Sequence, residues 1–389
     1  MQKIQKEGNI MADIKTHLRE LSVATTIGLL NLDIEFKRDD LYDSKRFLAY
    51  AKKVISGDIS SANNLITTPT FTGELKQIVD NGFQLGKEIY KNPHFEIKKS
   101  DPIHWLGNDT QKDDPVDITV GNYGFSLKEE SFILENMGLY KLLNCYTGSK
   151  YRKRHIFNDY APTEYDTWFR TTWNEMVKYL SSHSNTWTFK NSRKPRVSKI
   201  SLILNSVSLE FYENNTLDSK CTLPMNCGIS EYEDKTNSSI REEVFAKFIK
   251  QELDNNNAYN ASKRACAIAA SEALARELNT NLNYHAGLPR FLRIHENEYY
   301  YAKTTENGIT IYKVPSIDSF GVDIVIESIV SSVPDKQANI LTTIKNKTTG
   351  NTLTLRNECR FSHGQFNGTP EAKMYYEHGG SLLVIYESL

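Results

Sequence analysis

The chain of 389 residues lacks most of the signals that place a protein in a class at first sight. No apolar run approaches the roughly 20 residues that span a bilayer, and the N-terminal stretch MQKIQKEGNIMADIK is polar, unlike a signal peptide. Five cysteines form no CxxC pair, and their odd number argues against a complete disulfide framework. These absences predict a protein of the reducing cytoplasm with no membrane partner.

Nucleotide-binding and zinc signatures are also missing. The sequence contains no GxxxxGK[ST], GxGxxG or HExxH motif, although it has nine histidines. Its 47 basic and 48 acidic residues leave a net charge of −1, so a polyanionic partner must be met by local basic patches. Hydrophobic residues make up 39% of the chain, which is enough for a sizeable core, and the length predicts two or three domains.

Apolar spacing predicts alternating helical and strand-rich stretches. Helices are expected over residues 13–32, 39–58, 72–92, 131–144, 166–183, 241–254 and 261–279. Strands are expected over residues 116–120, 124–128, 199–212, 290–296, 299–305, 309–314, 322–330, 351–361 and 382–389. Residues 228–239 look like a linker. We therefore predict a mixed α/β (α+β) fold, with a body in residues 1–235 and a part with helices and a β-rich C-terminal region in residues 236–389.

One hairpin carries charged residues that a purely structural strand would avoid. In DDPVDITVGNYGFSLKEES, two alternating runs flank the loop GNYG. Pairing Val120 with Phe125 across this loop places Asp117 opposite Lys128, with Ser126 on the same face. A carboxylate can hold a hard cation such as Mg²⁺, and a lysine can orient or help deprotonate the attacking water. The hairpin therefore predicts metal-assisted phosphodiester cleavage.

The same residues resemble the PD-(D/E)xK nuclease signature, with Asp117 as the first acid and Ser126-Leu127-Lys128 in the second slot. The stretch YGFSLKEES before an expected helix is similar to HaeIII-type type II restriction endonucleases, in which a serine also precedes x-Lys. The resemblance covers only the hairpin and its flanks. It implies a nuclease-like core with helices around a central mixed sheet, Mg²⁺ as cofactor, double-stranded DNA as substrate and products with 5′-phosphates.

The hairpin departs from the family pattern at two positions. Val116 precedes the acid, with the proline one place earlier, and Ser126 stands where the pattern has a second acid. A further metal ligand must therefore come from elsewhere. The candidate glutamates are Glu74 and Glu88 on the preceding helix and Glu129 and Glu130 after the lysine.

Two other combinations of segments are rivals to this hairpin. Pro334-Asp335 with Glu371-Ala372-Lys373 matches letter by letter, and Asp323 with Thr343-Ile344-Lys345 is a partial match. We prefer the first hairpin, because Pro334 lies in an expected turn and the proline before Glu371 cannot donate to a central ladder.

Three segments are candidates for DNA contacts. Arginine and lysine clusters in expected loops can bind phosphates, and arginine, asparagine and glutamine can read base edges. These candidates are Arg152, Lys153 and Arg154, then Arg193, Lys194 and Arg196, and finally Arg356, Arg360, His363, Gln365 and Asn367. Solvated charge runs and a decorated hairpin loop are the alternatives.

The hypothesis that combines these features is a Mg²⁺-dependent, sequence-specific endonuclease of restriction type. It would act as a symmetric homodimer on a two-fold site, or as a monomer with a separate recognition domain. A non-catalytic nucleic-acid-binding protein and a scaffold protein remain the alternatives from other classes.

Overall fold

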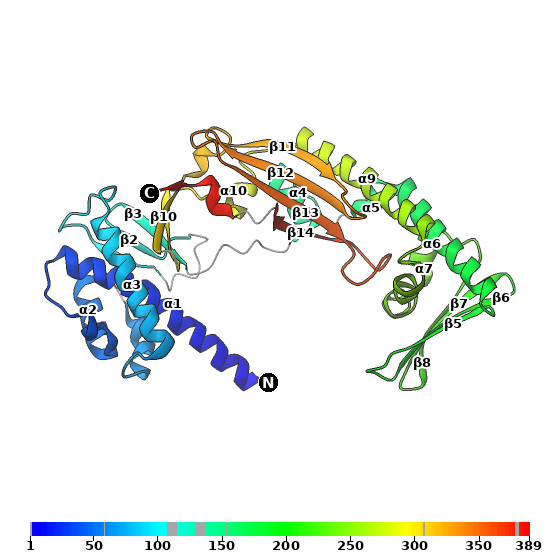
Figure 1. Ribbon diagram of the computed structural model, residues 1–389, viewed down its shortest axis with the longest axis horizontal. Coiled ribbons are helices and arrows are strands. Elements are labelled where there is room, and N and C mark those ends of the chain that lie inside the picture. Colours follow the sequence, from blue (N-terminus) through cyan, green and yellow to red (C-terminus); the bar gives the residue numbers. More distant parts are fainter. Residues whose placement is uncertain are drawn as a thin grey trace.

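The computed structural model describes residues 2–57, 59–106, 115–128, 137–152, 155–305, 308–377 and 381–389. These residues form an arch (Figure 1). N-terminal helices and a six-stranded sheet make one end, a five-stranded sheet makes the middle, and a four-stranded sheet makes the other end. The fold is mixed α+β, as predicted. In the part of the chain that the structure covers, no helix is both long and apolar enough to cross a membrane.

Three helices cover the first end of the arch, and their existence confirms the periodicity of the first hundred residues. They are α1 (Gln2–Asn31), α2 (Ser44–Val54) and α3 (Gly73–Lys91). Helices α1 and α3 pack at very short range because Gly82 and Gly86 lie against Ser22 and Thr26. A Cβ added at Gly82 would lie 2.4 Å from the Cβ of Ser22, and one at Gly86 would lie 2.8 Å from the Cβ of Thr26.

The six-stranded sheet under these helices mixes strands from distant parts of the chain. Its order is β1 (Ile103–Trp105), β2 (Ile118–Val120), β3 (Tyr123–Lys128), β9 (Tyr299–Thr305), β10 (Gly308–Val314) and β15 (Glu387–Ser388). Strands β1, β2 and β3 are antiparallel, whereas β3 and β9 run parallel. The predicted division at residue 235 therefore does not coincide with a boundary between sheets, because strands from both sides complete this one.

The hairpin of β2 and β3 exists, but its predicted register is wrong by two residues. Val120 pairs with Tyr123 and Ile118 with Phe125. The connection is a two-residue turn through Gly121, whose φ of 56° suits a tight hairpin turn. One face of the hairpin is apolar, because Ile118, Val120 and Phe125 are fully buried in the core that the N-terminal helices share.

The five-stranded sheet forms the middle of the arch. Its order is β11 (Ile324–Ser332), β12 (Ala338–Asn346), β13 (Thr352–Arg360), β14 (Glu371–Tyr376) and β4 (Met137–Gly138). Helix α9 (Asn257–Thr280) runs along it toward the far end (Figure 1). The strand predicted over 290–296 is wrong, since Leu288–Phe291 form the short helix α10, and residues 382–385 form a 3₁₀ turn instead of a strand.

The four-stranded sheet is a meander of β5 (Thr186–Lys190), β6 (Arg196–Ile203), β7 (Ser206–Glu213) and β8 (Thr216–Pro224). It packs with α6 (Pro162–Ser182) and with the helical stretch from Ile240 to Leu253. The predicted linker is wrong in part, because Ile229–Lys235 form helix α7. Ile229 and Tyr232 are buried, so this segment belongs to the core.

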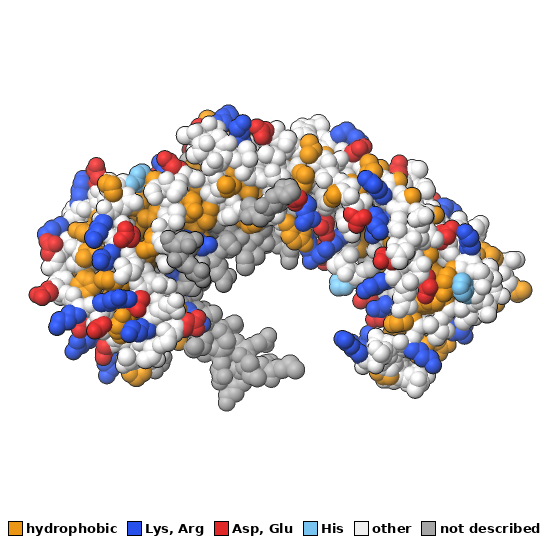
Figure 2. All heavy atoms as spheres, viewed as in Figure 1, with side chains coloured by type: hydrophobic (Ala, Val, Ile, Leu, Met, Phe, Trp, Pro, Cys, Tyr) orange, Lys and Arg blue, Asp and Glu red, His pale blue; other side chains and the backbone are white. Residues whose placement is uncertain are grey.

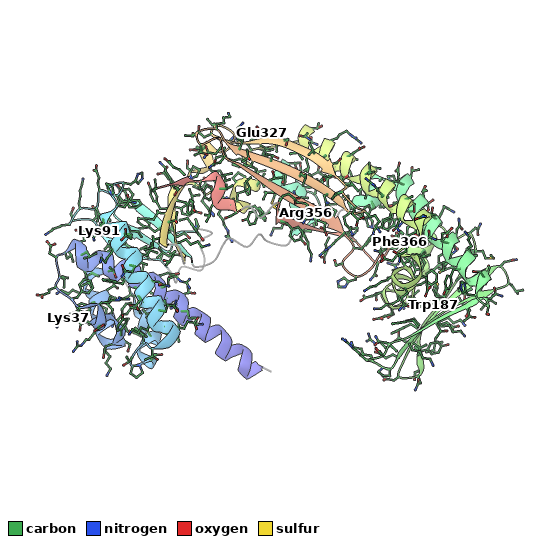
Figure 3. The ribbon with its side chains drawn as sticks, in the orientation of Figure 1. Lys37, Lys91, Trp187, Glu327, Arg356 and Phe366 are labelled. Carbon is green, nitrogen blue, oxygen red and sulfur yellow. The ribbon has the colours of Figure 1, made fainter. Side chains whose placement is uncertain are left out.

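The remaining helices connect these parts. Helix α4 (Leu139–Thr147) follows β4, and α5 (Ile156–Tyr160) leads into α6. In the loop after β13, Phe366 is fully buried against Trp168 and Phe169 of α6. Figure 3 labels Phe366 where this loop meets the helices of the far end. Aromatic packing therefore joins the middle of the arch to its far end.

Candidate functional site

Asp117, directly before β2, is held between the end of β1 and β3. Its N–H donates to the Phe125 carbonyl oxygen at 2.8 Å, and its own carbonyl oxygen accepts from Leu106 N–H at 2.9 Å. Its carboxylate atom Oδ2 accepts the main-chain N–H of Leu127 at 2.6 Å. A carboxylate that accepts a main-chain N–H is fixed in direction and stabilised as the anion. The structure therefore positions one negative charge beside the second slot of the motif.

The backbone geometry at Asp117 explains why its predicted pairing with Lys128 is wrong. Phe125 is the register partner of Ile118, yet its carbonyl oxygen also accepts the N–H of Asp117. Two residues of one strand thus oppose one residue of the other, as in a β-bulge, which re-aims the side chain. The predicted pair of Asp117 opposite Lys128 rests on strict alternation in a four-residue loop register, and neither condition holds here.

Glu20 brings a second carboxylate from helix α1. It is 2% exposed, and its Oε2 accepts the indole N–H of Trp105 at 2.7 Å. Trp105 is the register partner of Ile118, the residue directly after Asp117. The ring of His17, one turn earlier on α1, lies edge-on to Trp105 at 5.0 Å between centroids. A buried acid on α1 is thus held one strand away from the Asp117 position.

The electrostatics around Tyr301 link the same elements. Tyr301 on β9 is the register partner of Ser126, and both are buried. Burial, followed by neighbouring tyrosines, raises the pKa of Tyr301 to about 12; Arg19 lowers this pKa and Asp117 raises it further. Arg19 and Asp117 therefore act on one phenol, so α1 and the start of β2 approach the same region of the sheet.

The four glutamates predicted as further metal ligands are either exposed on α3 or outside the described residues. Glu74 is 66% exposed and forms an ion pair with Lys15 at 2.7 Å, and Glu88 is exposed on α3. Glu129 and Glu130 lie outside the described residues. Sequence reasoning missed Glu20; the available signal was an acid in the middle of the apolar stretch of residues 13–32.

The second slot is only partly visible. Ser126 is 1% exposed in the middle of β3. Lys128 ends β3 as the register partner of Lys303 on β9, and the side chain of Lys128 lies outside the described part of the structure. Among the residues that the structure describes, no group of three His, Cys, Asp or Glu side chains is arranged for a metal. Asp117 and Glu20 supply hard oxygen ligands, which are the kind that Mg²⁺ prefers.

A cavity of about 710 Å³ borders this hairpin. It is of the size that holds a drug-sized or nucleotide-sized group. Aromatic and polar side chains share its wall, including those of Thr119, Asn122, Tyr123, Arg290, Asn297 and Tyr300. Tyr300 is itself held by a hydrogen bond with His94 at 3.1 Å and donates to Glu298 at 3.1 Å.

The rival motifs are engaged in ordinary sheet contacts. Glu371 and Lys373 lie on the same strand with 3.8 Å between Oε2 and Nζ, and Lys345 is paired with Glu327 at 3.1 Å. Asp335 lies in a bend and is exposed, as the predicted turn requires.

The two arginines among the predicted base-reading residues at the C-terminal side are paired with acids. Arg356 contacts Glu358 at 2.7 Å and Glu377 at 2.8 Å, and its guanidinium lies 4.8 Å from the ring centre of Tyr375. Arg360 contacts Glu358 at 2.9 Å. Both guanidinium groups are already paired with acids of the protein. Arg356 could therefore contact DNA only by giving up its ion pairs with Glu358 and Glu377.

The rest of that segment is polar and partly open. His363 is exposed, and its carbonyl oxygen accepts the side-chain N–H of Asn367 at 3.3 Å. Asn367 also donates to Glu242 at 3.5 Å. Gln365 lines a small cavity together with Arg360.

The two earlier basic clusters differ in their availability. Arg196 is paired with Glu213 at 2.8 Å and with Glu243 at 3.1 Å. Arg193 and Lys194 are exposed in the bend between β5 and β6, where their N–H groups donate to Asn191 Oδ1. Arg152 is exposed, and Lys153 and Arg154 lie outside the described residues.

The surface as a whole has no single charge sign. Figure 2 shows lysine and arginine side chains interspersed with acidic ones over the face in view, including the rim of the hollow under the arch. The basic side chains at the tip of the four-stranded sheet face open space in this view. Any polyanion would therefore be held by local groups, as the net charge predicts.

No family model, no curated protein and no solved structure matches this chain. The fold and the geometry of individual residues are therefore the basis for a functional proposal.

Proposed function

We propose that the protein is a Mg²⁺-dependent double-stranded DNA endonuclease of restriction type, with its cleavage site at the β2–β3 hairpin. One observation carries the proposal: Asp117 is fixed beside the second slot of a PD-(D/E)xK-like motif, in a mixed sheet covered by helices. The resemblance of the segment to HaeIII-type enzymes supports the same conclusion. Cleavage would leave 5′-phosphates, and a symmetric dimer would suit a two-fold site.

The residues have separable roles in this proposal. Asp117 and Glu20 would hold the cation, because both are carboxylates fixed by hydrogen bonds from the strands. The bound cation would stabilise charge that develops on the phosphoryl oxygens. Lys128, two residues after Ser126 on β3, would orient the attacking water. Glu20 would take the place that the sequence left open among four other glutamates.

The shape of the molecule suits a long ligand. The β2–β3 hairpin lies at one end of the arch, and the four-stranded sheet, whose β5–β6 bend carries the exposed Arg193 and Lys194, lies at the other. The hollow between the ends is open in Figure 2. A duplex bound there would meet the hairpin at one end and a phosphate-binding bend at the other, which is the arrangement that backbone contacts require.

The test is cleavage of phage DNA with MgCl₂ by the wild-type protein and by Asp117→Asn. Asparagine keeps an acceptor for Leu127 N–H but removes the charge, so the fold is expected to survive. We expect cleavage to fall by at least about 100-fold, as for loss of a group that stabilises the transition state. Sequencing of the ends identifies the recognition site.

Glutamate variants make the matched comparison. Glu20→Gln should abolish cleavage to the same degree, whereas Glu74→Gln and Glu88→Gln should retain it, because those side chains face solvent. Full activity of both Asp117→Asn and Glu20→Gln would remove these residues from the mechanism. Magnesium-independent DNA binding without any cleavage by the wild type would favour the non-catalytic binding protein, and no salt-sensitive binding at all would favour the scaffold.

A further inference from the structure

A second polar site lies far from the hairpin, where the five-stranded sheet meets the helices of the far end. A cavity of about 20 Å³ opens there between α6, α9, the start of β12 and the end of β13. Phe157 and Phe361 form its apolar wall. Its polar wall consists of Trp168, Lys263, Lys336, Gln337, Arg360 and Gln365.

Three cationic side chains from three different elements converge on this cavity. Lys336 donates to Asn260 Oδ1 at 3.0 Å, and Arg360 contacts Glu358 at 2.9 Å. The ammonium of Lys263 makes no hydrogen bond or ion pair within the described ranges. Like charges held together in a partly buried place repel each other, and Lys263, unlike Arg360, has no ion pair of its own within the described residues.

The pKa of Lys263 reflects the same imbalance. Burial lowers it first, and the neighbouring Lys336 lowers it further. Asp254 and Asp335 act in the opposite direction but do not overcome these effects. An anion in the cavity would reverse the balance, because an opposite charge favours the protonated amine.

Neutral hydrogen-bond donors that line the cavity also indicate that an anion binds there. Trp168 is 1% exposed, and its indole N–H has no acceptor within the described residues. Gln337 and Gln365 line the same cavity, and neither side-chain amide has a hydrogen bond to another residue that the structure describes. A buried donor normally finds an acceptor, so the Trp168 indole N–H indicates a missing acceptor group, whereas the half-buried amides of Gln337 and Gln365 are further donors at the opening.

We propose that this cavity is a phosphate-binding site, in which one phosphate oxygen inserts between the three cations and the Trp168 indole. The volume admits a group about the size of one water molecule, so only an oxygen of the ligand enters. The other oxygens stay at the surface within reach of Arg360, whose side chain is 39% exposed. Phosphate offers several charged oxygens at this spacing, and arginine binds it in a fork geometry.

The phosphate belongs to a nucleic-acid backbone or to a small phosphorylated molecule, and the same chemistry recognises both. The site does not depend on the proposed cleavage at the hairpin. A test on protein that carries Asp117→Asn keeps any DNA intact, so failure of one proposal is not read as failure of the other.

The experiment follows the four tryptophan indole N–H resonances of the ¹⁵N-labelled full-length chain by NMR. Inorganic phosphate is titrated against chloride at equal ionic strength, and the resonance missing from Trp168→Phe assigns Trp168. We expect the Trp168 resonance to move and saturate with phosphate, and not with chloride. A duplex made from oligonucleotides with 5′-hydroxyl ends then distinguishes the sources. Movement of the same resonance by the duplex indicates a backbone phosphate, and movement by inorganic phosphate alone indicates a small phosphorylated ligand.

Charge variants test the contacts. Lys263→Met and Lys336→Met should each weaken phosphate binding at least tenfold, and Lys336→Arg should retain it. Arg264→Gln is the matched control, because Arg264 is the exposed neighbour of Lys263 on α9 and does not line the cavity. The proposal would be overturned by a Trp168 resonance that does not respond to phosphate, or by phosphate binding of Lys263→Met and Lys336→Met that equals binding by the wild type.

Discussion

The indole N–H of Trp105 on β1 donates to the carboxylate of Glu20 on α1, with 2.7 Å between Nε1 and Oε2. This bond joins the first helix to the sheet across 85 positions of sequence. It gives a buried acid its hydrogen-bond donor, which such a group requires. It also holds the Glu20 carboxylate one strand away from Asp117. The bond therefore affects both the stability of the fold and the position of Glu20, and these two effects can be measured separately.

The first prediction concerns Trp105→Phe, which keeps an aromatic ring but removes the donor. The free energy of unfolding should fall by about 1–3 kcal/mol, because hydrogen bonds to charged groups contribute more than neutral ones. DNA cleavage should fall as well, since Glu20 loses its orientation. Urea unfolding and a plasmid cleavage assay measure the two effects.

Trp187→Phe is its control, because the Trp187 indole makes a similar bond to Glu252 at 2.9 Å in the four-stranded sheet. It should lose stability but retain cleavage. Equal loss of cleavage in both variants would mean that stability alone explains the effect of Trp105→Phe.

The second prediction separates two substitutions of Asp117. Alanine leaves the Leu127 N–H without its acceptor, so Asp117→Ala should lower the free energy of unfolding by about 1–3 kcal/mol. Asp117→Asn should stay close to the wild type, because the amide oxygen can accept the same N–H. Both should lose cleavage. Thermal or urea unfolding of the pair decides the structural part, and identical stability of the two variants would contradict the role given to this hydrogen bond.

The third prediction concerns the contact of α1 with α3. Gly86→Ala places a Cβ 2.9 Å from the Val23 carbonyl oxygen and 2.8 Å from the Thr26 Cβ, so the two helices must move apart. Overpacking should cost about 1–3 kcal/mol, which exceeds the roughly 1 kcal/mol gained from helix propensity. Gln84→Ala, at an exposed position of α3, should be neutral or slightly stabilising. A more stable Gly86→Ala protein would show that the helices are not in close contact.

The fourth prediction concerns pH and Lys263. The folded-state pKa of this lysine lies below its ordinary value of 10.5, so the charged form is disfavoured in the folded protein. The resulting cost to stability is present at neutral pH, and it is relieved as the pH rises from the folded pKa toward 10.5. Lys263→Met should therefore be more stable than the wild type at pH 7 without phosphate, by a margin that narrows at high pH. Urea unfolding at several pH values measures this margin, and a margin that widens with pH would be the wrong sign.

The fifth prediction concerns acid and Glu210. The hydrogen bond from Lys220 lowers the pKa of Glu210 below 4.5, and Tyr212 donates to the same carboxylate at 2.8 Å. Stability from this group is present above pH 4.5 and is lost as the pH falls through the folded pKa. Glu210→Gln should be less stable at pH 7 by about 1 kcal/mol and should match the wild type at low pH. Denaturation curves at pH 7 and pH 3 provide the comparison.

Local patterns in the sequence predicted local structure well. The helical spacing of residues 13–32 and 72–92 and the alternation of residues 299–305 correspond to α1, α3 and β9. These elements bury one face, so their apolar periodicity carries the information. The linker over 228–239 was mispredicted because most residues of this segment are polar. Its two apolar residues Ile229 and Tyr232 are buried by partners that are distant in sequence.

The candidate site could be predicted only in part. The sequence predicted the strand that carries Ser126, and it proposed Asp117 as a site residue, but the register depended on a turn that shortens to two residues and on a bulge. The alternation of apolar and polar residues specifies neither the length of the turn nor the bulge. Glu20 could not be selected from the sequence, because the property that distinguishes it is the hydrogen bond from Trp105, a contact that exists only after the sheet has formed.

The parallel pairing of β3 with β9 has a consequence for protein synthesis. Phe125 can pair with Tyr300 only after β9 has been synthesised. The N-terminal helices therefore emerge from the ribosome long before the sheet that they cover can be completed. The chain between β3 and β9 must lose conformational entropy before the pairing of these two strands contributes any stability. Formation of such a sheet is therefore slow. A nascent or prematurely terminated chain would therefore carry the hairpin with an unpaired edge at β3, and the complete six-stranded sheet would exist only in molecules whose translation has passed β9.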